Sequence, residues 1–487
     1  MERNLKGSTA HHLASKIKWS SIGLARNLVS KIKWSSIGLV RKLILPITLL
    51  RSKREESRVI RLSRGLKYHH GTSQGERTVW IVSFTGVSDE PRVLRQAKAM
   101  MEDGWRVVVL GYDGRSPRDP GWHFVSLSDS PTFDAAKVRF LWRRFRLTRR
   151  LCALPVGPGA RKFLAKMQHG SIASWRVLTE YAHKFACTYP QLKPDLVISH
   201  DFHTCELGYA IASTYKCHFS VDCHEYARGQ YMHDDDWKKY SRPYICGMHD
   251  YYFPKADLLT TVCDGIANCL EHEEKLHRKV QVVRSVPFYS EQKYRPVGEK
   301  IKILYHGNVS YIRGLHKLIK AFPLLRDEFV LTIRGDGDGE YIEDLRKLSH
   351  GLGLENKVMF EAPVPFDEIV PAANLSDIGY FVHKDTSPQK RFVLPNKYFE
   401  YIMAGLALCT NDLPEMARVT KEFDIGLLVN DYDENEIARE LNQIERNSIE
   451  RYKRNAIEAA KTLNWDWEKG RMLGAYNEIM ASEPILS

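Results

Sequence analysis

From residue 77 onward, short apolar runs rich in β-branched residues alternate with segments of helical periodicity. Such runs are typical of strands buried on both faces, and their alternation with helices is typical of a parallel sheet. The pattern predicts five strands in a first half, at residues 79–83, 107–110, 195–199, 219–222 and 258–262. It predicts five more in a second half, at residues 301–305, 329–334, 358–360, 378–382 and 406–410.

A polar, proline-containing stretch at residues 289–299 interrupts this series, and we interpret it as a linker. The fold class is therefore α/β, with two Rossmann-like, doubly wound domains. Ligands of such sheets bind outside the carboxyl ends of the strands, so we expect the two domains to face a cleft. The predicted parts are an extension (1–75), a first domain (76–290), a second domain (296–465) and a terminal helical segment (466–482).

The net charge of +13 belongs to the N-terminal extension. Residues 1–67 hold 16 of the 72 Lys and Arg residues but three of the 59 acidic residues, which leaves 56 of each sign elsewhere. The extension also contains a tandem repeat of 15 residues, at 15–29 and 30–44, with three differences between the copies. Two copies are too few for a solenoid.

Wound as a helix, the repeat gathers isoleucines and leucines on one side, with basic residues and tryptophans around them. This composition favours a segment that lies in the interface of an anionic membrane. The alternative is a recent duplication in a poorly ordered extension. Nucleic-acid binding is not predicted, because no recognition module accompanies the basic residues.

Compartment signals are consistent with a cytoplasmic protein that is peripheral on the inner face of a membrane. The nine cysteines form no Cys-x-x-Cys pair, which favours a reducing compartment. The longest strongly apolar run of the extension, residues 43–50, contains a proline and is far shorter than the ~20 residues of a membrane span. The basic residues recur along the extension instead of preceding one apolar core, so no secretory signal is predicted.

Residues 394–405 carry the most informative candidate chemistry and read Leu-Pro-Asn-Lys-Tyr-Phe-Glu-Tyr-Ile-Met-Ala-Gly. The Pro-Asn pair predicts a helix start with Asn396 as the N-cap, and Gly405 predicts the helix end. A helix N-terminus attracts phosphate, and a carboxylate near the first turn, that of Glu400, can accept hydrogen bonds from a pair of sugar hydroxyls. The alternative is that Glu400 is a solvated helix residue.

This segment resembles the Pro-x-Lys-x-Phe-Glu-Tyr-x-x-x-Gly signature of family 4 glycosyltransferases (glycosyl transferases group 1). The resemblance spans residues 77–482 and implies the GT-B fold and sugar transfer with retention of configuration. It implies that Glu400 holds the ribose of the donor nucleotide. Most members carry a second glutamate eight positions earlier, where this chain has Phe392. The chain is thus similar to the subgroup that keeps only the Pro-x-Lys-x-Phe-Glu-Tyr form.

Residues 305–315, after the first predicted strand of the second half, form the candidate diphosphate site. Glycines such as Gly307 let backbone amides approach phosphate, and Arg313 can place a guanidinium on the diphosphate. The family element that this loop resembles usually has two basic residues, but Asn308 stands where the first is common. The second cation is then Lys397, or Lys390 and Arg391.

Two further loops complete the predicted donor site. Gly335 lies in a Gly-x-Gly turn that follows the next strand, although a plain tight turn explains it equally well. Pro363 lies in the loop that, by resemblance, rests against the nucleotide base. The predicted donor residues are Gly307, Asn308, Arg313, Gly335, Pro363, Asn396, Lys397 and Glu400.

In the first half, the strand at 195–199 leads into His200 and His203, at the ligand side of the sheet. The resemblance implies that His200 contacts the donor sugar and the acceptor. Two histidines and an aspartate at this spacing are also compatible with a metal site, and His200 could equally be a packing residue. We predict no metal and no cofactor, because GT-B enzymes stabilise the leaving diphosphate with cations and helix dipoles.

The acceptor side is predicted to comprise Gly86, Arg92, His203 and Glu225. Gly86 and Arg92 lie where the first strand passes into a helix, and Glu225 lies in an Asp-x-His-Glu segment. All these segments resemble acceptor-side elements of the family. Glu225 could contact the acceptor, and a structural role as a hydrogen-bonding residue explains it equally well.

Residues 139–150 interleave cations with aromatic side chains. Such a segment could dock on a membrane or bind an anionic acceptor, or it could be a solvated basic helix.

The sequence thus predicts a transferase that moves a sugar from a nucleotide-diphosphate donor to a glycan or lipid-linked acceptor, in polysaccharide or glycolipid synthesis at a membrane surface. The catalytic residues are predicted to be His200, Arg313 and Glu400, with Arg313 stabilising the departing diphosphate. The alternatives are a nucleotide-sugar epimerase of the same fold and a non-catalytic nucleotide-sugar-binding membrane protein.

Overall fold

The computed structural model describes residues 67–114, 121–127, 182–183, 185–274, 276 and 279–485. The predictions for the tandem repeat and for the basic segment 139–150 lie outside these residues, as does nearly all of the extension. Within the described residues, no helix is long and apolar enough to span a membrane.

The first sheet has eight strands in the order β1-β4-β3-β2-β5-β6-β7-β8. Every neighbouring pair is parallel except β1 with β4. The central strands are almost completely buried, as their β-branched and aromatic residues predict. The strands are β1 (Lys67–His69), β2 (Thr78–Gly86), β3 (Arg106–Tyr112), β4 (His123–Ser126), β5 (Leu196–His200), β6 (His218–Cys223), β7 (Leu258–Thr261) and β8 (Gln281–Val282).

Helices follow the strands of this sheet at their carboxyl ends. Helix α3 begins with Pro91, a residue suited to the first helical position because its missing N–H needs no partner there. Residues 283–298, which follow β8, contain no helix or strand. The longer helices of this half are α3 (Pro91–Glu102), α7 (Asp201–Tyr215), α8 (Arg242–Tyr252) and α9 (Asp264–Glu274).

The second sheet has six strands in the order β11-β10-β9-β12-β13-β14, all parallel. They are β9 (Ile301–His306), β10 (Phe329–Arg334), β11 (Val358–Glu361), β12 (Ile378–Phe381), β13 (Ala407–Asn411) and β14 (Gly426–Val429). The helices between and after them are α10 (Leu315–Ala321), α11 (Gly339–Gly351), α12 (Ile369–Ala373), α13 (Pro388–Arg391), α14 (Asn396–Met403), α15 (Pro414–Phe423), α16 (Glu434–Gln443) and α17 (Arg446–Ala460).

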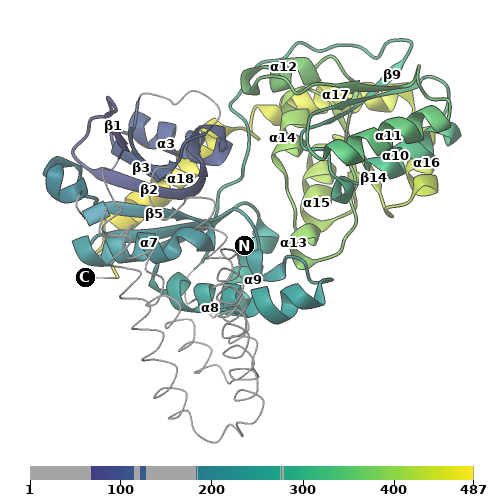
Figure 1. Cartoon of the computed structure of the whole chain (residues 1–487). Helices are drawn as coiled ribbons and strands as arrows, with labels where there is room; N and C mark the ends of the chain where they lie inside the picture. The colour runs from purple at the N-terminus through teal and green to yellow at the C-terminus, as the bar shows by residue number, and fades with distance from the viewer. Residues whose placement is uncertain are drawn as a thin grey trace, which may run out of the picture. The chain divides into compact units, whose positions relative to one another are not determined.

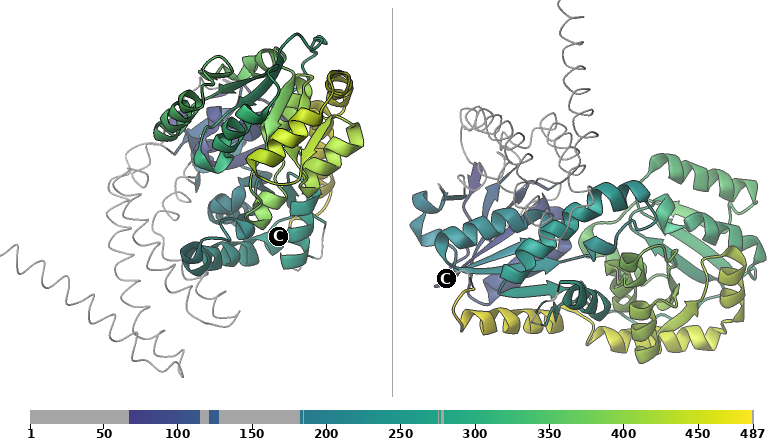
Figure 2. Two further views of the ribbon diagram at one scale, coloured as in Figure 1. Left: turned by 90° about the vertical axis from the view of Figure 1, so that its right-hand side faces the viewer. Right: turned by 90° about the horizontal axis from the view of Figure 1, so that it is seen from below.

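The last helix, α18 (Trp465–Met480), packs on the first sheet although it follows the second one in the chain. In Figure 1 this yellow helix lies among the purple and teal elements, and the right panel of Figure 2 shows it along the same half of the chain. It contacts α3 and β7. Asn464 caps it, because its side chain accepts hydrogen bonds from the backbone N–H groups of Asp466 and Trp467 at 3.0 and 3.3 Å.

The predicted α/β fold with two parallel sheets is confirmed, and each of the ten predicted strands overlaps an observed one. The prediction missed β1, β4, β8 and β14, which are two to four residues long. Runs this short carry little periodicity, and β14 opens with a glycine. The terminal helix begins at Trp465, one residue before the predicted segment 466–482, directly after its Asn464 cap.

Candidate functional site

Helix α14 forms where the sequence predicts it, with one difference at its start. The N-cap is Pro395, in an extended conformation, and Asn396 is the first helical residue and provides no side-chain cap. The prediction of Asn396 as the N-cap was therefore wrong by one residue. The helix ends before Gly405, whose φ of +68° is the left-handed conformation that glycine adopts without strain.

Glu400 lies on α14 and pairs with His306, the last residue of β9. The two side chains meet at 2.8 Å between Glu400 Oε2 and His306 Nε2. The backbone N–H of His306 donates to the hydroxyl of Tyr401, whose ring packs against the imidazole. His306 thus holds one oxygen of the Glu400 carboxylate at the carboxyl end of β9. The side chain of Glu400 keeps 15% of its surface exposed.

Lys397, one turn before Glu400, is a buried cation without a hydrogen-bond partner for its Nζ atom. The ammonium lies 4.0 Å from the ring centroid of Tyr305 and next to Gly307, where an added Cβ would come within 3.1 Å of it. Burial, and then the positive charge of Arg313, lower the pKa of Lys397 to about 7. An unsatisfied buried ammonium is costly, so it marks a position where an anion would be stabilised.

Arg313 ends a short 3-10 helix (Tyr311–Arg313) that precedes α10. Its Nε atom is buried without a hydrogen-bond partner, and its guanidinium lies 5.9 Å from the ring centroid of Phe381. The ammonium of Lys397 lies 5.6 Å from the same ring. Burial and the charge of Arg313 also lower the pKa of Lys390 on α13. Arg313, Lys390 and Lys397 therefore form one group of cations, which we call the cation cluster.

The glycines around this cluster are required by close backbone packing. Gly307 has a φ of +103°, and Gly335 presses on it so closely that a Cβ there would lie 2.0 Å from the Gly307 carbonyl oxygen. Gly337 packs in the same way on Val309, with which it forms a bridge. Gly335 thus supports the loop at 307–309, in agreement with the plain-turn interpretation of its sequence.

The remaining predicted donor residues are exposed. Asn308 lies beside Gly307, and its backbone carbonyl accepts a hydrogen bond of 2.6 Å from the Tyr305 hydroxyl. Pro363 is exposed in the loop after β11. Arg391 is bonded outside the cation cluster, because its Nε donates to Asp385 at 3.0 Å on the surface.

Phe392, at the position of the second family glutamate, contacts the first half of the chain. A Cβ added to Gly265 would lie 2.3 Å from its ring, and its carbonyl oxygen accepts a 3.2 Å hydrogen bond from the Cys263 thiol. The neighbouring Gln389 accepts from the backbone N–H of Tyr226. Phe392 therefore packs on the start of α9, a contact that needs an apolar side chain and a glycine opposite it.

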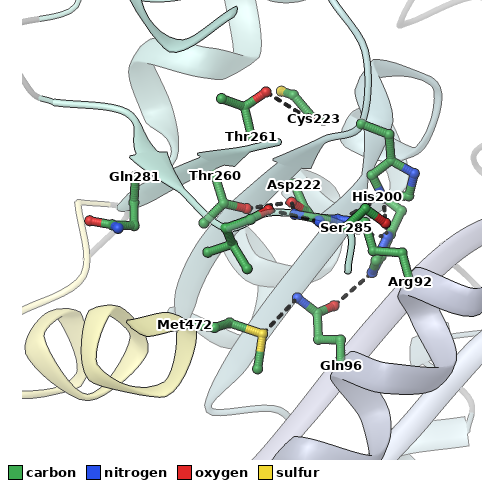
Figure 3. A network of polar contacts seen from close by, with 12 residues as sticks. Arg92, Gln96, His200, Asp222, Cys223, Thr260, Thr261, Gln281, Ser285 and Met472 are labelled. Atoms are coloured by element: carbon green, nitrogen blue, oxygen red, sulfur yellow. Dashed lines mark hydrogen bonds and ion pairs between the residues drawn. The ribbon is translucent and has the colours of Figure 1, made fainter. Parts of the chain in front are cut away.

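The first sheet carries a second polar group, which is drawn in Figure 3. Arg92 of α3 donates to both carboxylate oxygens of Asp222 on β6, each at 2.6 Å, and to the carbonyl of Val283 at 2.9 Å. Thr260 donates to the same carboxylate at 2.5 Å. Burial opposes the charge of Asp222, but Arg92 outweighs it and holds the pKa of the carboxyl well below its usual range. Arg92 thus positions Asp222, and its three guanidinium nitrogens are bonded within the domain.

His200 ends β5 and faces Asp222 in the register of the sheet. Its side chain is buried, and both ring nitrogens have partners: Nε2 lies 2.7 Å from Gln96 Oε1 and Nδ1 lies 2.8 Å from His224 Nε2. Burial, followed by the charge of His224, lowers the pKa of His200 to about 3. His200 is therefore a neutral internal residue, so the predicted contact with a sugar is not compatible with this arrangement.

His224 is the imidazole of this pair that reaches the surface, with 19% of its side chain exposed. It lies 3.4 Å from Asp222 and 3.6 Å from Asp201, and its backbone N–H donates to Asp201 at 2.9 Å. Burial opposes its charge, but the two aspartates outweigh it and raise the pKa of His224. Asp201 has a φ of +59°, a conformation that costs an aspartate energy and that recurs at functional sites.

His200, Asp222 and His224 bring their ligand atoms within 4.8 Å of one another, the geometry of a possible metal site. The donor set does not fit a cation, because both oxygens of Asp222 already accept from a guanidinium at 2.6 Å. The two imidazoles also face each other at hydrogen-bond distance. These residues are accounted for by the hydrogen bonds that they make to one another.

The other predicted acceptor-side residues lie near this group. Gly86 ends β2, and His203 is exposed on α7 with its ring against Phe202. Glu225 is exposed and accepts a hydrogen bond from Gln230. The surrounding protein, and then the charge of Asp201, raise the pKa of Glu225, while Arg313 of the second half lowers it. Glu225 and the cation cluster are therefore within electrostatic range of each other.

Sequence reasoning missed three residues of these sites: His306, His224 and Gln96. His306 and His224 were inside quoted motifs, at a strand end and beside Glu225, and a titratable residue at the carboxyl end of a parallel strand is itself a signal. Gln96 lies in the helix that resembles the acceptor-side entrance of the family, but nothing local showed its role, because its partner His200 lies 104 positions away.

Comparisons with known proteins agree with this architecture. Residues 289–463 match the family model described as Glycosyl transferases group 1, so this part of the chain is a domain of that family. Among curated protein sequences, none matches the chain significantly.

Solved structures match over most of the chain. Sucrose-phosphate synthase from Thermosynechococcus elongatus is 12% identical, with a TM-score of 0.61, and the match covers 83% of this chain and 99% of that one. HepE from Anabaena in complex with UDP is 13% identical, with a TM-score of 0.57 and coverage of 82% and 100%. A UDP-forming α,α-trehalose-phosphate synthase from Burkholderia vietnamiensis is 13% identical, with a TM-score of 0.57 and coverage of 85% and 98%. The chain has the GT-B fold of glycosyltransferase structures, as predicted.

Proposed function

We propose that this protein is a retaining glycosyltransferase that moves a sugar from a nucleotide-diphosphate donor to an acceptor hydroxyl. The observation that carries the proposal is the cation cluster. Lys397 and Arg313 each keep a buried nitrogen without a hydrogen-bond partner, beside the glycine loop at the carboxyl end of β9. A diphosphate has the charge and the acceptor oxygens that these groups lack. The family match of residues 289–463 supports the same reaction class.

In this proposal Glu400 binds the ribose of the donor. His306 occupies Glu400 Oε2, and no hydrogen bond engages Oε1 among the described residues, so this atom is available for a sugar hydroxyl. HepE has been solved with UDP-glucose, a donor of this class. We propose that the nucleotide base lies on the β10 and β11 side of β9, because Gly335 and Pro363 follow those neighbouring strands.

The chemical step breaks the bond between the sugar carbon and the diphosphate oxygen and forms a bond from that carbon to the acceptor oxygen, while the proton of the acceptor hydroxyl passes to the departing diphosphate oxygen. Negative charge grows on the leaving diphosphate, and Arg313, Lys390 and Lys397 stabilise it there. Fixed charges that face the developing charge are the largest kind of term available to such a site. We propose no metal and no cofactor besides the nucleotide sugar.

We propose that His224 takes the role that the resemblance gave to His200. It is the partly exposed imidazole of the pair, and its two aspartates favour the charged form. His224 is followed directly by Glu225, which is within electrostatic range of Arg313. A charged imidazole at this place is suited to hydrogen bonding with the transferred sugar.

The acceptor is proposed to be a glycan or a lipid-linked sugar at an anionic membrane surface. This part rests on the basic N-terminal extension, whose residues 1–67 carry a formal charge of +13. We propose on this basis that the protein acts in the cytoplasm, peripheral on the inner face of a membrane, in polysaccharide or glycolipid synthesis. Flotation with anionic liposomes tests it: loss of binding on removal of residues 1–67 is expected, and undiminished binding would exclude the role.

The transferase proposal is tested with UDP-, GDP- and ADP-sugars. We expect at least one to raise the melting temperature of the full chain, and to release nucleotide faster than Arg313→Ala or Glu400→Ala variants do. Formation of a new sugar or free nucleotide without any effect of acceptors would indicate the epimerase alternative. Binding of the donor with no turnover in wild type would indicate the non-catalytic alternative.

A further inference from the structure

A buried row of hydrogen bonds connects the terminal helix α18 to His224. The Tyr476 hydroxyl lies 3.1 Å from Gln96 Nε2, Gln96 Oε1 lies 2.7 Å from His200 Nε2, and His200 Nδ1 lies 2.8 Å from His224 Nε2. Figure 3 shows Gln96 reaching from α3 between Met472 of α18 and the His200 side. Tyr476, Gln96 and His200 are all at most 3% exposed.

The direction of these hydrogen bonds follows from the partners at each end. His224 lies against Asp222 and Asp201, so its charged form, with a proton on Nε2, is favoured. His200 must then accept at Nδ1 and carry its own proton on Nε2. That N–H needs an acceptor, which is the Gln96 carbonyl oxygen. The amide nitrogen of Gln96 is left to donate to Tyr476.

The charged groups around the histidine pair come from four elements. Asp222 lies on β6, Asp201 at the start of α7, Glu225 next to His224, and Arg92 on α3. Arg92 opposes the charge on both imidazoles, and the aspartates favour it. Besides these charges, the lone pair that His200 Nδ1 offers to His224 also stabilises the charged form of His224. Gln96 determines whether Nδ1 offers this lone pair, because it accepts the hydrogen bond from the proton on Nε2 of His200.

We propose that Gln96 and Tyr476 are positioning residues that hold His200 in the tautomer protonated on Nε2, and through it hold His224 charged and oriented for sugar transfer. This rests on the proposed function, because it assigns His224 a role in the reaction. It also gives helix α18 a positioning role in the reaction beyond its packing on the first sheet. Neither Gln96 nor Tyr476 touches the reacting groups; both act through His200.

The experiment measures kcat, KM and the pH profile of sugar transfer by the full chain and three variants. Gln96→Met removes the acceptor for His200, so the basic limb of the profile is expected to move to lower pH and kcat to fall about tenfold to a hundredfold. Gln96→Glu provides a stronger acceptor only, so the basic limb is expected to move to higher pH. Tyr476→Phe is expected to shift the limb in the same direction as Gln96→Met, with kcat reduced about fivefold.

Ser285→Ala is the matched control. It removes a buried 2.8 Å hydrogen bond that Arg95 of the same helix α3 donates, with no link to His200. We expect it to leave the pH profile unchanged. Nitrogen-15 NMR of labelled histidines gives a readout independent of activity: His200 should be protonated on Nε2 in wild type and lose this single form in Gln96→Met.

The outcomes separate this inference from the proposed function. An active wild type whose basic limb stays in place in both Gln96 variants overturns the inference alone, as does protonation of His200 on Nδ1. A wild type that neither binds nor turns over any nucleotide sugar overturns the proposed function and the inference with it. If Gln96→Met fails to fold, the opposite shifts expected for Gln96→Glu and Tyr476→Phe decide.

Discussion

The two polar groups of this protein are built in opposite ways. Around Asp222 in the first sheet, the donors and acceptors meet each other: Arg92 is bonded through all three guanidinium nitrogens, and both nitrogens of His200 have partners. Around Gly307 in the second sheet, Lys397 and Arg313 keep buried nitrogens without partners. The first group is complete without a ligand, and the second is not.

The difference indicates that the two sheets have different roles, one in positioning a side chain and the other in binding an anion. A saturated network stabilises one arrangement of side chains, and it therefore suits the positioning of a single exposed group such as His224. An unsaturated cation cluster lowers the stability of the free protein, and the cost is offset when an anion binds. Substitutions in the first group should accordingly lower the stability, and substitutions in the second group should leave it unchanged or raise it.

The largest effect on stability is expected from Arg92→Ala. This change leaves Asp222 buried without its partner, so the unfolding free energy should fall by about 3–5 kcal/mol. Urea denaturation of the full chain measures it. A loss below 1 kcal/mol would mean that the network around Asp222 does not stabilise the fold, contrary to the difference drawn between the two groups.

Arg313→Ala should affect the reaction and leave the fold intact. Because the Nε of Arg313 has no partner to lose, the urea midpoint should stay at the wild-type value. The loss of charge stabilisation at the diphosphate should lower kcat about 10²- to 10³-fold. Arg346→Ala, which changes an exposed arginine on α11, is the control and should leave kcat unchanged.

Lys397→Met should make the free protein more stable while it abolishes nucleotide binding. The pKa of Lys397 falls from 10.5 to about 7 on folding, so its charge is a penalty that is fully present below pH 7 and disappears as the pH rises toward 10.5. The gain in unfolding free energy should be on the order of 3 kcal/mol at pH 6 and clearly smaller at pH 9. A variant less stable than wild type at pH 6 would contradict this account.

Nucleotide affinity should depend on pH through the same lysine. A bound diphosphate favours charged Lys397, so binding takes up a proton above pH 7. The Kd for the nucleoside diphosphate that binds best among UDP, GDP and ADP should be nearly constant below pH 7 and should rise by up to about tenfold per unit above it. Calorimetry in buffers of different ionisation enthalpy measures the proton uptake. Lys397→Arg, which is charged throughout, should remove it; persistent uptake in that variant would assign the proton elsewhere.

The smallest effect is expected from Arg391→Ala. Its guanidinium is 60% exposed and pairs with Asp385, so it is a surface ion pair outside the cation cluster. The affinity for the same nucleoside diphosphate should change less than about twofold by the same calorimetry. A large loss of affinity would mean that Arg391 also belongs to the cation cluster. Lys390→Met, which does remove a member, is the positive comparison and should weaken binding more.

Much of the fold could be predicted because the central strands are buried on both faces and therefore read as continuous apolar runs. The helix with Glu400 and the loop with Arg313 were also predictable, since proline, asparagine and glycine mark their ends locally. The short strands β1, β4 and β8 were not, because their pairing partners and not their own sequences define them.

The site was predictable only where its chemistry is local in the sequence. The Glu400–His306 pair joins positions 94 apart, and the orientation of the His200 ring depends on a glutamine 104 positions away. No pattern within a motif shows which of two histidines near a strand end will be buried. The sequence therefore predicts the sugar contact at His200, whereas tertiary packing buries His200 and leaves His224 partly exposed.

The position of α18 at the end of the chain also delays completion of the first domain during synthesis. The first sheet is complete in sequence at Val282, but the helix that supplies Met472 and Tyr476 to it is synthesised after the whole second domain. At about 5–20 residues per second, the roughly 200 intervening residues take about 10–40 s. During that time the ribosome holds a first domain whose Gln96 side chain and adjoining apolar surface have no cover. We expect the nascent chain to need a chaperone in this interval, and a chain cut after Leu463 to aggregate on synthesis.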